Sequence, residues 1–218
     1  MTAHRWEVVA VAQLERLARP GLGGTLPDQE RGPRETPDGP WVYCAGNLDV
    51  LAWRTVALVG GGASGPALAA AVRIGRELAV RGMVTVCDPA GKIGAEAIGE
   101  VSKYEGQIVL VSQSCGGLPR MPEVGPFGPG AAAPSLVLEV PEGRQEDSAR
   151  MSAVVGAVSD AVVVLDVGGP LAGEVARESL RRGKATFIRR GAGDATSETG
   201  CVVFDSFTEI LEVVGSLP

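Results

Sequence analysis

Residues 55–87 read TVALVGGGASGPALAAAVRIGRELAVRGMVTVC, and this stretch decides the fold. Thr55–Val59 is a short apolar run typical of a buried strand, and it ends in three glycines. Pro66–Arg81 carries its apolar residues on one face, which predicts a helix, and Gly82 stands where a C-cap glycine belongs. Met83–Cys87 is a second apolar run. The stretch therefore predicts two parallel strands joined by a helix.

The same alternation continues to the end of the chain. Further strands are expected over Gln107–Ser112, Ser135–Val140, Ala161–Val167, Ala185–Arg189 and Cys201–Phe204. Further helices are expected over Ile93–Tyr104, Glu146–Val158, Leu171–Arg182 and Phe207–Val214. Short apolar strands that alternate with longer helices are typical of a doubly wound α/β fold. The sequence thus predicts a mostly parallel sheet with helices on both faces.

The first forty residues differ from the rest. Val8–Leu17 is expected to form a short helix, whereas Pro20–Pro40 is rich in proline, glycine and charge and is expected to be a loop or disordered linker. We therefore predict an N-terminal arm or linker over residues 1–40 and one α/β domain over residues 41–218.

Composition limits the chemistry. A net charge of −6 argues against a large non-specific DNA footprint, but it leaves room for a local basic patch. His4 is the only histidine, which removes histidine-based acid–base catalysis and most metal sites. Cys44, Cys87, Cys115 and Cys201 show no CxxC spacing and are expected to be small buried hydrophobes in a reducing compartment. Without an apolar run of about 20 residues or a signal peptide, the chain is expected to be cytoplasmic. No metal or cofactor is expected.

A first glycine-rich loop follows the strand at Thr55–Val59. Gly60, Gly61 and Gly62 would let backbone amides approach a phosphate at the start of the next helix, and Ser64 would add a hydroxyl. The spacing is neither a GxGxxG fingerprint nor a P-loop. The alternative is a tight turn without a ligand.

A second loop, after Met83–Cys87, contains Asp88, Ala90, Gly91 and Lys92. Asp88 could accept a hydrogen bond from a ribose or another hydroxyl, and Lys92 could meet a phosphate. In the alternative interpretation Asp88 only caps the next helix and Lys92 is solvated.

A third loop follows the strand at Ala161–Val167. Gly168 and Gly169 precede a helix, with Glu174 in its first turn. The amides of this loop would converge with those of the other two loops at the strand ends. Glu174 could face the same cleft or be a surface carboxylate that favours the helix dipole.

Residues 177–190 hold six lysines or arginines and one acid. Arg177, Arg181, Arg182 and Lys184 form a candidate nucleic-acid patch within this segment. The alternative is a solvated helix face.

Trp41–Ser64, WVYCAGNLDVLAWRTVALVGGGAS, resembles the entry to the domain of the DprA/Smf family of DNA-processing proteins. The resemblance continues in the same order at Gly82–Gly94, Leu138–Pro141, Ala153–Pro170 and Leu171–Gly191. It implies an extended Rossmann fold, related to the LOG and nucleotide-binding superfamily, that binds single-stranded DNA. It also implies a homodimer and a RecA-type recombinase as partner, in DNA recombination and natural transformation.

Three departures from the family pattern shape the hypothesis. Gly61-Gly62 replace the family's arginine after the first strand, Cys87–Ala90 replace its SGGA-type loop, and Arg150 matches only the last arginine of its F..RNR motif. We expect single-stranded DNA or a nucleotide-type phosphate ligand at the strand ends, with Arg150 completing the pocket and no catalysis. The alternatives are a paralogue that binds a small nucleotide-derived ligand, a non-catalytic partner subunit, or a LOG-type phosphoribohydrolase that uses Glu174.

Overall fold

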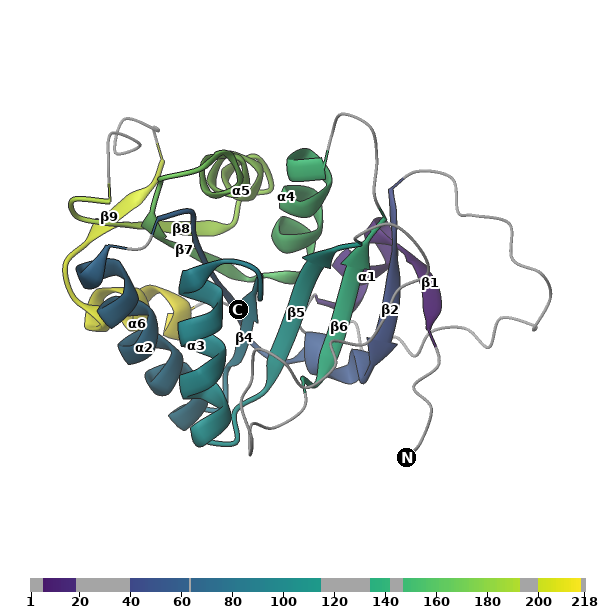
Figure 1. Cartoon of the computed structure of the whole chain (residues 1–218), viewed down its shortest axis with the longest axis horizontal. Coiled ribbons are helices and arrows are strands. Elements are labelled where there is room, and N and C mark those ends of the chain that lie inside the picture. Colours follow the sequence, from purple (N-terminus) through teal and green to yellow (C-terminus); the bar gives the residue numbers. More distant parts are fainter. Residues whose placement is uncertain are drawn as a thin grey trace.

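The computed structural model describes residues 6–18, 40–62, 64–114, 134–141, 147–192 and 200–216. In this part of the chain, nine strands form one sheet in the order β1-β2-β6-β5-β4-β3-β7-β8-β9 (Figure 1). The strands are β1 Glu7–Ala10, β2 Trp41–Gly46, β3 Thr55–Gly60, β4 Val84–Cys87, β5 Ile108–Gln113, β6 Leu136–Val140, β7 Ala161–Asp166, β8 Ala185–Arg189 and β9 Val202–Phe204. The helices are α1 Val11–Leu17, α2 Gly65–Val80, α3 Lys92–Lys103, α4 Asp147–Val158, α5 Pro170–Arg181 and α6 Phe207–Ser216, with a 3-10 helix at Leu48–Ala52.

The sheet is mostly parallel. All pairs from β6 across to β9 are parallel, and only β1–β2 and β2–β6 are antiparallel. From β3 the chain adds β4, β5 and β6 on one side and then returns to place β7 on the other side of β3. The predicted doubly wound α/β fold is confirmed.

Helices cover both faces of the sheet (Figure 1). One apolar core joins α1, α4 and α5 to one face, and a second joins α2, α3 and α6 to the other. The middle of β7, Val162–Leu165, is fully buried because both faces are covered. This burial explains why β7 is a continuous run of valine and leucine rather than an alternating pattern.

The residues of helix α2, which follows the first glycine-rich loop, explain how it packs against the sheet and against α3. Ala67, Ala71 and Leu78 are buried against the sheet. Gly75 brings α2 close to α3, since a Cβ there would lie 3.2 Å from the Ala97 carbonyl oxygen. Gly82 has φ +68°, as expected for the glycine that ends the helix.

The N-terminal segment differs from the prediction. The helix expected over Val8–Leu17 begins only at Val11, and Glu7–Ala10 is strand β1 instead. Val9 is buried where β1 pairs with Val42 of β2, so strand pairing decides the conformation of these β-branched residues. Residues 6–18 thus contribute a strand and a helix to the layers, while the boundary between residues 40 and 41 stays a prediction. Of the proline-rich stretch Pro20–Pro40, residues 20–39 lie outside the described residues.

Among the described helices, none combines the length and apolar character that a bilayer-spanning segment requires. The described part of the chain also brings no three histidine, cysteine or acidic side chains together in a way that could hold a metal ion.

Candidate functional site at the carboxyl edge of the sheet

The strand order reverses between β3 and β7, and this position is where open α/β sheets bind ligands, just beyond the carboxyl ends of the strands. The three predicted loops follow β3, β4 and β7, so all three lie at this edge. Helices α2, α3 and α5 begin directly after them, which directs three helix N-termini toward the same edge. The fold therefore brings the predicted loops together.

The glycines of the first loop are required by the close packing of the first and third loops. A Cβ on Gly61 would overlap the carbonyl oxygen of Gly168, and one on Gly62 would overlap the carboxylate of Asp166. The Gly61 amide also donates to the Asp166 carbonyl oxygen at 3.3 Å. Loop packing thus accounts for Gly61 and Gly62 without a ligand.

Asp166 joins these loops and was not among the predicted ligand-binding residues. Its Oδ1 accepts a hydrogen bond from the Gly168 amide at 2.7 Å, and its Oδ2 accepts one from the Ser64 hydroxyl at 3.3 Å. Ser64 and Gly168 therefore lie on either side of one carboxylate, and both already donate hydrogen bonds to it. An acidic residue at the end of a strand, two positions before a pair of glycines, was the signal in the sequence.

The second loop has a similar internal hydrogen bond. Oδ1 of Asp88 accepts from the Ala90 amide at 2.9 Å. Burial raises the pKa of Asp88, and the hydrogen bond from Ala90 partly offsets this rise. Gly91 is the N-cap of α3, and Lys92 is its exposed first residue.

A small cleft lies where these loops meet. Gly60, Asp88 and Gly91 line it together with Gly94 and Leu171, and its volume is about 30 Å³. That is room for about one or two water molecules. A phosphate-bearing ligand would therefore lie over this edge rather than inside it.

Arg150 and Glu174 are not among the residues that line this cleft. Arg150 is exposed on α4. Glu174 lies on α5, where its Oε2 is buried without a hydrogen-bond partner in the described part of the chain. Cys115 lies outside the described residues.

Much of the positive charge in the predicted nucleic-acid patch is neutralised. Glu178 accepts hydrogen bonds from both Arg181 and Arg182, at distances of 2.6–2.7 Å. Arg182 also pairs with Glu15 of α1 at 2.8 Å. Hydrogen bonds from Arg181 and then Arg182 lower the pKa of Glu178 to about 2. Arg177 is exposed and Lys184 half-buried, so the role of this patch stays a prediction.

Comparison with known proteins gives a likeness of fold only. No protein-family model matches the sequence, and no curated protein matches it. Among solved structures, DNA processing protein A from Helicobacter pylori, described with its single-stranded DNA binding mode, has a TM-score of 0.66 and 16% identity and covers 97% of this chain and 96% of its own.

Two further structures show how far the likeness extends. DNA processing protein A from Streptococcus pneumoniae has a TM-score of 0.66 and 17% identity, covering 95% of this chain and 74% of its own. The molybdenum cofactor carrier protein of Chlamydomonas reinhardtii has a TM-score of 0.57 and 14% identity, covering 75% of this chain and 96% of its own. The chain thus has the Rossmann-like fold that these proteins share, and nearly its whole length follows DNA processing protein A, as the resemblance to the DprA/Smf family predicts.

Proposed function

We propose that this protein binds single-stranded DNA along the carboxyl edge of its sheet and carries out no reaction of its own. The observation that carries the proposal is the fold match over 97% of the chain to the Helicobacter pylori protein, whose structure is described with its mode of single-stranded DNA binding. The position of the loops supports it, because the strand order reverses where the three loops gather.

The backbone amides that remain available define how the strand would be held. The amides of Gly61, Ala90 and Gly168 donate to acceptors within the chain. Those of Gly62 and Gly91, by contrast, have no acceptor in the part of the chain that the structure describes. Together with the helix N-termini they form the anion-binding surface of the proposal.

Side-chain charge at this edge is mixed. Lys92 supplies a cation at the first turn of α3, whereas Asp88 and Asp166 place carboxylates beside the available amides. Contacts to phosphate would therefore supply modest affinity, which decreases as the salt concentration rises. With aromatic residues at only 4% of the chain, base stacking contributes little to this binding.

Fluorescence anisotropy with a labelled oligothymidine, at low and at moderate salt, tests the proposal. Lys92→Gln should weaken binding, because it removes the cation nearest to the loops. Lys103→Gln is the matched control, because it lies at the other end of the same helix and its ammonium pairs with Glu100 at 2.7 Å. Absence of binding by the unaltered protein at low salt would refute the proposal.

A second candidate is a small nucleotide-derived ligand. It is favoured by the fold match to the molybdenum cofactor carrier protein. A mononucleotide bound there would raise the melting temperature in proportion to ln(1 + [L]/Kd). The homodimer and the RecA-type partner implied by the family resemblance remain part of the proposal, and sedimentation with and without a recombinase tests both.

A further inference from the structure

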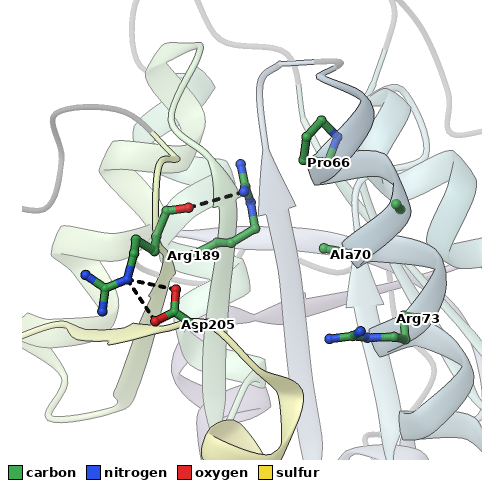
Figure 2. Close-up of a pocket in the computed structure, with 7 residues that line it drawn as sticks. Pro66, Ala70, Arg73, Arg189 and Asp205 are labelled. Atoms are coloured by element: carbon green, nitrogen blue, oxygen red, sulfur yellow. Dashed lines mark hydrogen bonds and ion pairs between the residues drawn. The ribbon is translucent and has the colours of Figure 1, made fainter.

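A separate hollow of about 260 Å³ lies between α2 and the ends of β8 and β9. Arg73, Arg189 and Asp205 line it (Figure 2). Arg190 is the third arginine of its lining. We call it the arginine pocket. Small side chains from the first half of α2, among them Ala70, leave the space open. Pockets for whole small molecules usually measure about 300–1,000 Å³, so this one suits a single charged group.

Arg189 is held in place before any ligand arrives. Its Nε donates to the Leu165 carbonyl oxygen at 3.0 Å, and its Nη1 donates to the Arg190 carbonyl oxygen at 3.2 Å. Both acceptors are backbone atoms, and the side chain is half-buried. A guanidinium fixed in this way loses little conformational freedom when it binds an anion.

Arg190 is oriented by Asp205 but keeps donors available. Its Nε lies 2.8 Å from each carboxylate oxygen of Asp205. The two Nη atoms have no acceptor in the described part of the chain. Asp205 thus positions Arg190 through its Nε and leaves the two Nη groups available to donate to a ligand.

Arg73 faces this pair from the other side. Figure 2 shows its side chain extending from α2 toward the strands. It is exposed and makes no hydrogen bond or ion pair with any residue that the structure describes. Three arginines and one aspartate leave the arginine pocket with two net positive charges in a chain of net charge −6.

We infer that the arginine pocket binds a phosphate group. Guanidinium groups from two sides of a small hollow match the size, charge and acceptor geometry of a phosphate. Pro66, which lines the pocket, lies two residues after Ser64 of the first loop, so the pocket adjoins the carboxyl edge. Where the phosphate belongs to a DNA strand, the inference rests on the proposed function, and the pocket is a second contact for the strand's backbone.

The test compares Arg73→Gln with Arg81→Gln in the full chain. Both substitutions remove one positive charge from the same helix, but Arg81 lies at its far end and pairs with Glu77. With labelled oligothymidine we expect Arg73→Gln to weaken binding about tenfold, as the loss of one charge-assisted contact would. The slope of log K against log salt should fall by about 0.7. Arg81→Gln should leave both quantities unchanged.

A second assay separates the two sources of phosphate. Inorganic phosphate should raise the melting temperature of the unaltered protein above that in chloride of equal ionic strength, and Arg73→Gln should abolish the increase. If the unaltered protein does not bind oligothymidine but its melting temperature rises with phosphate, the proposed function is refuted and the phosphate site in the arginine pocket is supported. Identical behaviour of the two arginine variants in both assays would overturn the inference.

Discussion

Replacing Gly61 with alanine should destabilise the protein strongly, because the new methyl group has no place to go. It would overlap the Gly168 carbonyl oxygen and lie 2.9 Å from the Cα atom of Gly169. Both neighbours are backbone atoms that cannot rotate aside, so the β3–α2 and β7–α5 loops would have to separate. Forcing extra atoms into a packed contact costs about 1–3 kcal/mol, and we expect the upper end of this range here.

Thermal unfolding followed by circular dichroism measures the effect. For a chain of this size, each kcal/mol lowers the melting temperature by about 2–4 °C, so a loss of about 3 kcal/mol corresponds to a fall of about 6–12 °C.

Gly65→Ala is the matched control for this experiment. A Cβ at Gly65 meets no atom within 4 Å, and the residue is the first of α2. Both substitutions stiffen the unfolded chain equally, so their difference reports the folded state alone. We expect Gly65→Ala to leave stability unchanged or to raise it by up to about 1 kcal/mol. If the two variants have the same melting temperature, the two loops are not in contact in solution and close packing does not explain the glycines.

Three further outcomes follow from the contacts described. Hydrogen bonds from Arg181 and Arg182 lower the pKa of Glu178 from its ordinary 4.5 to about 2 in the folded protein. The ionised Glu178 therefore stabilises the folded protein fully above pH 4.5, and this contribution is lost as the pH falls toward 2. Glu178→Gln should lower the free energy of unfolding by about 1 kcal/mol at pH 7 after solvent screening. In denaturant unfolding at a series of pH values, this free energy should also fall less between pH 4.5 and pH 2 than in the unaltered protein; the same pH dependence in both proteins would contradict the assignment. Asp160→Ala should cost about 2 kcal/mol in urea unfolding, because Oδ2 accepts from the buried Thr55 amide and hydroxyl at 2.8 and 3.2 Å; a smaller loss than 0.5 kcal/mol would mean that water replaces these bonds. Burial raises the pKa of Cys44 to about 12 and also raises that of Cys87, so peptide mapping should find iodoacetamide on these thiols only after unfolding, and labelling of the folded protein would refute their burial.

Elements built from continuous apolar runs could be predicted closely from the sequence. The strand expected over Ala161–Val167 is Ala161–Asp166, and the helix expected over Leu171–Arg182 is Pro170–Arg181. A fully buried strand needs apolar residues on both faces, so its signal is strong. Strand β1 gave no such signal, because four residues at an edge take their conformation from the partner strand.

The site could be predicted only in part. Local sequence identified the three loops, and their placement at one edge follows from parallel strand order. The hydrogen bond between the Asp166 carboxylate and Ser64 could not be assigned in advance, because Ser64 belongs to a loop about a hundred residues earlier. The arginine pocket was missed for the same reason, since Arg73 lies far from Arg189 in the sequence and only the sheet brings them together.

The antiparallel strands at one edge have a consequence for synthesis on the ribosome. Strand β2 pairs with β1 and with β6, and β6 follows β2 by about 90 residues. At about 5–20 residues per second, β1 and β2 wait about 5–20 s before β6 is made. A pair of strands alone is marginally stable in water, so the apolar side chains of Val9 and Val42 stay accessible to chaperones during this interval. Strands β1 and β2 thus complete their packing only after β6 has been synthesised.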